Sequence, residues 1–105
     1  MAVDSVGSVT GIALSGVRAA SRTQRVSAHN VANFQTEGFA PQRARQVASP
    51  AGGAITEVEQ TTEPKPVDLA SERVTSSVAG TQAKASIRVL DTHLDLVGSI
   101  IDITR

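Results

Sequence analysis

Hydrophobic and small residues recur with helical spacing over two long stretches, one near each end of the chain. In the first stretch, residues 3–33, one row repeats every seven positions and a few apolar residues lie on the adjoining flank. The row consists of Val6, Ala13, Ala20, Ser27 and Phe34, and the flank carries Val17 and Val31. Residues at this spacing share one face of an α-helix. The pattern therefore predicts an N-terminal helix over residues 3–33.

Small residues are frequent on this flank of the first helix, at Gly16, Ala19, Ala20 and Ala28. Without bulky side chains between them, two helix backbones can approach each other closely. We therefore expect tight packing of another helix here rather than a roomy ligand pocket.

A second helix is predicted over residues 68–103. Pro64 and Pro66 hold the preceding chain extended, and Asp68 is a suitable N-cap. Glu72 lies near the first turn, where an acidic side chain favours the positive end of the helix dipole. A seam typical of a coiled coil follows, with alternating spacings of four and three residues. Its members are Ala83, Ile87, Leu90, Leu94, Val97 and Ile101.

The same helix carries a second apolar row on another flank, formed by Ala85, Val89, Leu96, Ile100 and Ile103. A narrow polar strip remains, formed by Lys84, Arg88, Asp91, Asp95 and Asp102. A helix with two apolar rows requires neighbours on more than one side.

The two rows are expected to have different partners. We expect the first seam, Leu94 included, to pack within the chain against the small residues around Ala13 and Ala20. The second row, Leu96 and Ile100 included, is expected to face a neighbouring subunit. The sequence thus predicts one row for folding and one for assembly.

Prolines and glycines punctuate residues 40–66, where the short segments QRARQVA and AITEVEQ flank the turn-forming string SPAGG. This pattern indicates either a small β-hairpin or an extended excursion, and it is too short for a second domain. Residues 1–105 are therefore predicted to form a single, mainly α domain. Its long N- and C-terminal helices pack as an antiparallel hairpin or coiled coil around a short connection.

Two asparagines mark the end of the first predicted helix. Asparagine tolerates left-handed backbone geometry, and its short amide can bond to neighbouring main chain. Asn33 is therefore predicted to end the helix, and Asn30 to tie the departing chain back to it. Gly38 is expected to adopt a positive φ in the following turn, and Phe39 to anchor the outgoing segment against the helices.

The composition predicts a thin core. The chain has 105 residues, of which 40% are hydrophobic and only two, Phe34 and Phe39, are aromatic. A small domain with small apolar side chains buries little area per residue. We therefore expect partners to complete the fold.

Charge and hydropathy exclude several classes of partner. Ten basic and ten acidic residues cancel, and the basic residues form no block, so neither a nucleic-acid partner nor a polybasic membrane anchor is expected. The sequence contains no apolar stretch of roughly 18 residues, so no direct membrane span is expected. Asp4 lies where a secretory signal needs Lys or Arg, and no cleaved signal peptide is expected.

Catalytic and metal-binding patterns are also missing from the sequence. His29 and His93 lie in helical stretches without partners at metal-ligand spacing. Asp91 and Asp95 share a helix face that points away from His93, and the string around them lacks the glycine of a calcium loop. The chain has no cysteine, P-loop, G-x-S-x-G or G-x-G-x-x-G motif. We therefore expect no enzyme, no metal and no cofactor.

The stretch ALSGVRAASRTQRVSAHNVANFQTEGF resembles the N-terminal signature of the bacterial flagellar basal-body rod and hook family. That signature has an Ala-x-Asn-x-Ala-Asn core followed by a Thr-x-Gly-aromatic turn. The matching positions are Ala28, Asn30, Ala32, Asn33, Thr36, Gly38 and Phe39. PVDLASERV and IRVLDTHLDLVGSIIDI resemble the beginning and the hydrophobic end of the family's C-terminal helix. Two departures are His29 within the Asn-rich core and AKAS at residues 83–86, where the family has an aromatic-Gln-Ala-Asn block.

The resemblance implies a structural subunit of the flagellar basal-body rod, of the short rod type, which assembles through its terminal helices. The implied partners are other copies of itself, other flagellar axial proteins and the flagellar type III export apparatus. Such proteins are exported without a cleaved signal peptide, and the implied location is the periplasm-spanning rod of the basal body. A free-standing helical-hairpin adaptor or accessory protein derived from a rod protein is the alternative that stays open.

Overall fold

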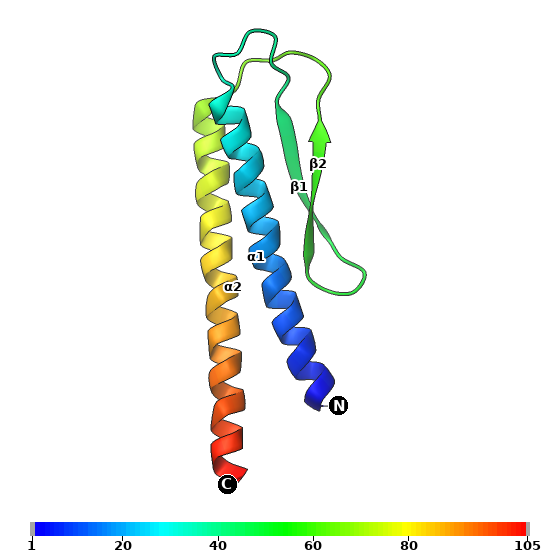
Figure 1. Cartoon of the computed structure of the whole chain (residues 1–105), viewed down its shortest axis with the longest axis vertical. Coiled ribbons are helices and arrows are strands. Elements are labelled where there is room, and N and C mark those ends of the chain that lie inside the picture. Colours follow the sequence, from blue (N-terminus) through cyan, green and yellow to red (C-terminus); the bar gives the residue numbers. More distant parts are fainter. Residues whose placement is uncertain (1, 105) are drawn as a thin grey trace.

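The computed structural model describes residues 2–104, and the side chains of residues 8–102 within them. It contains the helix α1 (Ala2–Ala32), the strands β1 (Gln42–Ala48) and β2 (Ala54–Gln60), and the helix α2 (Leu69–Thr104). The two helices run antiparallel and pack against each other, and β1 and β2 form an antiparallel hairpin between them in the sequence (Figure 1). The predicted mainly α fold is confirmed, and of the two alternatives for residues 40–66 the β-hairpin is correct.

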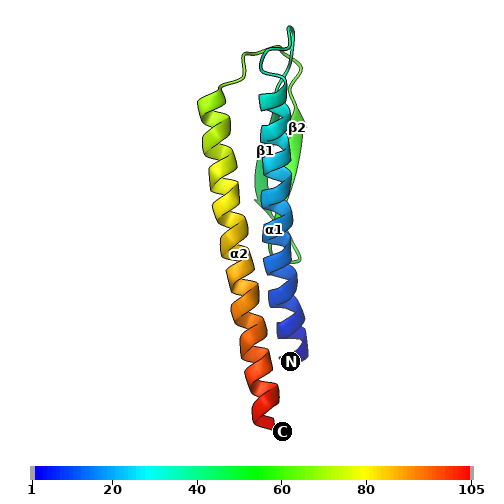
Figure 2. The ribbon, with the colours of Figure 1, turned by 60° about the vertical axis from the view of Figure 1, so that its left-hand side comes forward.

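The elements form three layers, with α1 in the middle. Two views, 60° apart, place α2 on one side of α1 and the β-hairpin on another (Figures 1 and 2). The molecule is an elongated slab of 64 × 24 × 14 Å. Because α1 has neighbours on two sides, it contributes most of the buried apolar residues. These are Ala13, Ala19, Ala20 and Val26 of α1, with Ala79 of α2.

Small side chains line the seam between the two helices. Ala13, Ala20 and Ser27 are buried on α1, as their seven-residue spacing predicts. A Cβ atom added to Gly16 would lie 2.3 Å from Ser86 Oγ, so the backbones approach closely at this level. Val6 and Ile103 lie outside the residues whose side chains are described.

The α2 side of the seam differs from the predicted one. Its buried and half-buried positions also alternate spacings of four and three residues, and Leu90 and Val97 belong to them. The other members include Glu72, Ser76, Ala79, Ala83, Ser86 and His93. Ala83, Leu90 and Val97 form one seven-residue row as predicted, whereas Ser86 and His93 replace the larger residues of the other row. Small or polar side chains take six of these eight positions.

The prediction that Leu94 packs against the small residues of α1 is wrong. Its side chain is 52% exposed, as is that of Ile101, and Ile87 is also exposed. The physical reason is the close approach at Gly16, which accepts the small Ser86 but not the bulkier Ile87 at the next position. Leu94 and Ile101 follow Ile87 at seven-residue spacing and lie outside the seam with it. Leu96 and Ile100 point to solvent, at 59% and 61% exposure.

The β-hairpin has one face against α1 and one face toward solvent. Thr56, buried on the inner face, donates a hydrogen bond from Oγ1 to the carbonyl of Ala19 at 2.7 Å. The Ala54 amide donates to Ser15 Oγ at 3.1 Å. On the outer face, Arg45 pairs with Glu57, its partner in the strand register, at 3.0 Å.

Two glycines close the hairpin turn. Gly52 and Gly53 have φ values of 94° and 86°, a left-handed region that side chains with a Cβ rarely adopt. They belong to the SPAGG string, so the predicted turn is confirmed, and the strands match the two segments on either side of it.

Candidate assembly surface

A partly buried polar cluster joins the ends of the two helices to the first strand. We call it the helix-end clasp and define it as Ser27, Asn30, Gln42 and Glu72. Asn30 is 1% exposed, and its Nδ2 donates both to the Gln42 carbonyl at 2.8 Å and to Glu72 Oε1 at 2.9 Å. Its Oδ1 accepts from the Gln42 amide at 2.9 Å. One short side chain of α1 thus bonds to both main-chain groups of Gln42 in β1 and to Glu72 in α2.

Ser27 completes the clasp from one turn earlier in α1. Its hydroxyl lies 2.5 Å from Glu72 Oε2 and 2.9 Å from the Glu72 carbonyl, so it can donate to either. Glu72 lies in the first turn of α2, as predicted. Asp68 also acts as predicted, since its Oδ1 accepts a hydrogen bond from the Ser71 amide at 3.2 Å, an N-cap interaction. The role of Glu72 as a partner of α1 was not predicted, because it requires the two helix ends to meet in space.

The end of α1 turns without left-handed geometry at Asn33. Positive φ among the non-terminal described residues occurs at glycines, including Gly38 at 73° as predicted. Asn33 acts instead through its side chain, which donates to the His29 carbonyl at 2.9 Å and accepts from the Thr36 hydroxyl at 3.2 Å. Phe39 contacts the helix as expected, with its ring centroid 5.5 Å from that of His29.

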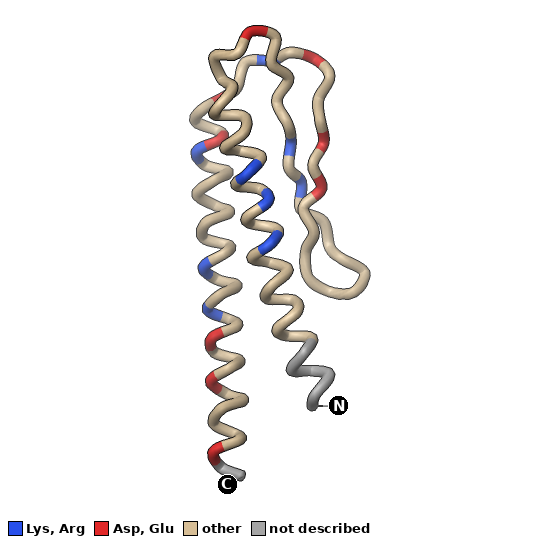
Figure 3. The backbone as a smooth tube through the Cα atoms, viewed as in Figure 1, with Lys and Arg blue, Asp and Glu red and all other residues tan. Residues whose placement is uncertain are grey.

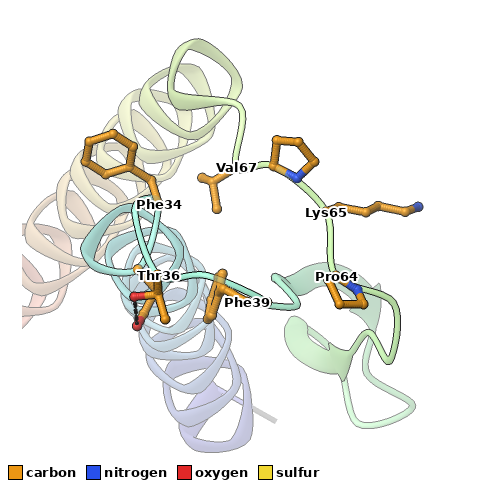
Figure 4. A pocket seen from close by; sticks show the side chains of 9 residues that line it. Phe34, Thr36, Phe39, Pro64, Lys65 and Val67 are labelled. Atoms are coloured by element: carbon orange, nitrogen blue, oxygen red, sulfur yellow. Dashed lines mark hydrogen bonds between the residues drawn. The ribbon is translucent and has the colours of Figure 1, made fainter.

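This turn forms one wall of a shallow hollow at the end of the molecule. The other wall is the extended segment that leads into α2, and Figure 4 shows Phe34, Thr36 and Phe39 on one side and Pro64 and Val67 on the other. The Lys65 amide donates to the Phe39 carbonyl at 3.2 Å and holds the two walls together. Of the residues that match the family signature, Ala28 and Ala32 lie outside these contacts and are exposed.

A second polar bridge links the β-hairpin to α2. Gln46 of β1 and Gln82 of α2 exchange two side-chain hydrogen bonds, at 2.7 and 2.8 Å. Gln46 also donates to Thr23 Oγ1 of α1 at 3.3 Å. These glutamines were not singled out in the sequence, because a polar residue at a mostly exposed position gives no local signal of its distant partner.

Much of the apolar surface of α2 is exposed. Large hydrophobic side chains are exposed along its described length, on both sides of the seam with α1. They are Leu69, Val74, Val78, Ile87, Val89, Leu94, Leu96, Ile100 and Ile101. At about 100° per residue, Val74, Val78, Val89, Leu96 and Ile100 lie close to one line along the helix. Exposed apolar surface of this extent marks an interaction site.

Charged residues occupy the outer edge of α2. Figure 3 shows most charged positions of α2 along the side turned away from α1, with basic positions near its start and in its middle and acidic ones toward its end. The acidic positions are Asp91, Asp95 and Asp102, and the basic positions before them are Arg73, Lys84 and Arg88. The charge on the outer surface of this helix therefore changes from positive to negative along its length.

Among the described residues, no three His, Cys, Asp or Glu side chains are placed to hold one metal ion. Neither helix, over the part of the chain that is described, has a stretch apolar enough to cross a bilayer. No protein-family model and no curated protein matches the sequence.

Proposed function

We propose that this protein is a structural subunit of the bacterial flagellar basal-body rod, which assembles through its terminal helices. The observation that carries the proposal is the unpartnered apolar surface of α2, exemplified by Leu96 and Ile100, on a helix already packed against α1. A 36-residue helix with exposed large side chains along most of its length needs further neighbours.

The residues of the family signature support this proposal through the work they do in the fold. Asn30 holds the start of β1 against both helices, Asn33 bonds to the last turn of α1, and Gly38 supplies the positive φ of the exit turn. Each of these residues makes a contact or a turn that suits its residue type, in the order that the rod and hook family uses.

The proposed partners are other copies of this chain and other axial proteins of the flagellum. The proposed route to the assembly site is the flagellar type III export apparatus, and the proposed location is the rod that spans the periplasm. A thin core is compatible with this route, since the buried apolar residues among those described are mostly alanines, whose burial contributes little stability each.

Deletion of the gene tests the proposed function directly. We expect loss of swimming and loss of complete basal bodies by electron microscopy, with both restored by a plasmid copy. A plasmid copy carrying Leu96→Asp should accumulate in the cell but fail to restore motility. Intact basal bodies and normal swimming in the deletion strain would contradict the proposal.

A free-standing helical-hairpin adaptor is the second candidate. The observation that favours it is that hydrogen bonds close the chain on itself, from Gln24 Nε2 to the Ser76 carbonyl at 3.2 Å and between Gln46 and Gln82. Sedimentation over a range of concentrations distinguishes the two. Open-ended association supports the rod subunit, whereas a defined dimer or a one-to-one complex supports the adaptor.

A further inference from the structure

Two exposed charged surfaces of opposite sign lie on opposite sides of the helical hairpin. The outer face of α1 carries Arg18, Arg22 and Arg25, and no acidic residue occurs between Ser8 and Ala32. At about 100° per residue these arginines point away from the buried row that contacts α2. Within the described part of the chain, none of the three forms an ion pair.

The acidic surface lies on the outer face of α2. Asp91, Asp95 and Asp102 are all exposed, and no Lys or Arg occurs between Val89 and Thr104. Figure 3 shows this acidic run on the side of α2 that is turned away from α1. Leu94, which is 52% exposed, lies beside these carboxylates at about 100° per residue. The acidic surface therefore borders an exposed apolar side chain.

The two charged surfaces are offset along the long axis of the molecule. The contacts Gln24 to Ser76 and Gly16 to Ser86 align the helices, and they place Arg22 level with a point near Ala79. Asp95 lies 16 positions further along α2, which corresponds to about 24 Å at 1.5 Å per residue. The acidic and basic surfaces therefore cannot meet within one chain.

We infer that a second copy of this chain docks on the outer face of α2, displaced by about 24 Å along the helix axis. This inference rests on the proposed function, whose assembly contact it specifies. In this arrangement Asp91 and Asp95 of one copy face the arginines at 22 and 25 of the next. Leu94 becomes covered in the same contact. Opposite charges on two separate faces give a contact that is complementary and directional.

The same displacement places the basic part of α2 opposite the C-terminal end of α1 in the next copy. Lys84 and Arg88 of one copy then lie level with Asn33 and His29 of the next, at the C-terminal end of its α1. Cations are stabilised at the negative end of a helix dipole. Glu37 follows in the adjacent turn and adds a carboxylate to that surface. Both signs of charge on α2 are thus matched by one displacement.

The contact is heterologous, because one copy contributes α2 and the next contributes α1. Such contacts repeat without closing on themselves when no rotation closes a ring, and they generate polar filaments or tubes. The competing arrangement is a two-fold dimer in which two α2 helices run antiparallel and pair Lys84 and Arg88 with Asp95 and Asp91. It leaves the arginines of α1 without partners, and for that reason we favour the displaced copy.

Paired charge reversals test the contact. We expect Asp91→Arg/Asp95→Arg and Arg22→Glu/Arg25→Glu each to lose the sedimenting species, while far-ultraviolet circular dichroism shows an unchanged fold because all four residues are exposed. An equimolar mixture of the two variants should assemble again, since each reversed face then meets a complementary one. Arg43→Glu, an exposed reversal on the hairpin, serves as the matched control and should assemble normally.

The outcomes separate the contact from the proposed function. Assembly of Arg22→Glu/Arg25→Glu like the wild type, or no recovery on mixing, overturns the displaced contact and leaves the rod function standing. If the wild-type chain stays monomeric and the deletion strain still swims, both the displaced contact and the rod function are overturned. Recovery by mixing is not expected for the antiparallel dimer, because the arginines of α1 take no part in it.

Cysteine cross-linking gives an independent measurement, because the chain contains no cysteine of its own. We expect the single variants Arg22→Cys and Asp95→Cys, mixed and oxidised, to form a disulfide between chains. The double variant should form a ladder of cross-linked species. A disulfide-linked dimer formed instead by mixing Lys84→Cys with Asp95→Cys, and none with Arg22→Cys, would establish the antiparallel dimer and refute the displaced contact.

Discussion

Asn30 and Gln42 bond to each other as two paired residues of neighbouring strands would. The Asn30 amide donates to the Gln42 carbonyl at 2.8 Å, and its Oδ1 accepts from the Gln42 amide at 2.9 Å. A helix side chain thereby satisfies both main-chain groups of the first residue of β1. The remaining hydrogen of the same amide goes to Glu72 at 2.9 Å, which connects this pair to α2.

Removal of the Asn30 amide should be costly. In Asn30→Ala, both main-chain groups of Gln42 and the carboxylate of Glu72 lose a partner in a half-buried place, so we expect the free energy of unfolding to fall by about 3 kcal/mol. Urea unfolding followed by circular dichroism measures it. Asn33→Ala is the control, since its half-buried amide bonds to one carbonyl, and about 1 kcal/mol is expected. Equal losses in the two variants would show that the clasp does not stabilise the fold.

A side chain at Gly16 should push the helices apart. In Gly16→Val the new Cβ would meet Ser86 Oγ at 2.3 Å, whereas a Cβ at Gly11 meets nothing within 4 Å. Because both changes replace glycine with valine in the same helix, their difference isolates the steric effect. We expect Gly16→Val to be less stable than Gly11→Val by about 2 kcal/mol, the cost of overpacking. Thermal melts that rank the variants in the opposite order would contradict the close approach.

The corrected seam changes which leucine supports the fold. Leu90 is half-buried against α1, and Leu94 is 52% exposed. A charge placed in an apolar contact without a partner is costly. We therefore expect Leu90→Asp to lose helicity in dilute solution and Leu94→Asp to keep it, as measured by circular dichroism. If Leu94→Asp is the variant that unfolds, the seam contains Leu94, as the hydrophobic pattern predicts, and not His93.

His93 carries a polar atom that the seam does not satisfy. Its Nε2 is buried and has no hydrogen-bond partner among the described residues. Burial of such an atom costs about 1 kcal/mol or more. His93→Leu should therefore raise the free energy of unfolding by about 1 kcal/mol, and the midpoint of thermal unfolding with it. A lower midpoint would mean that this nitrogen has a favourable role in the native protein.

Several elements of the fold were predictable because their causes are local. The strands follow the segments QRARQVA and AITEVEQ, since the glycines between them permit the positive φ values of the turn. Asp68 caps α2 because its carboxylate lies within reach of the Ser71 amide three residues later. Gly38 takes a positive φ of 73° for the same kind of reason. Each of these features depends on a few neighbouring residues.

The candidate assembly surface was predictable only in part. Leu96 and Ile100 are exposed, as the second apolar row predicted, because helical periodicity places them away from any face that includes Leu90. Periodicity did not separate Ser86 from Ile87, or His93 from Leu94, as members of the seam. Both choices give spacings of four and three residues, so the hydrophobic pattern favoured the larger side chains.

By itself, the sequence determined where the helices, strands and turns lie, since periodicity, prolines, glycines and capping residues act over one or two turns of chain. The tertiary structure alone decided which side of α2 meets α1, because that depends on the space beside Gly16. It also decided that Asn30 and Glu72 bond to each other across 42 positions of sequence. Such contacts depend on shape and on hydrogen-bond partners that only the folded chain brings together.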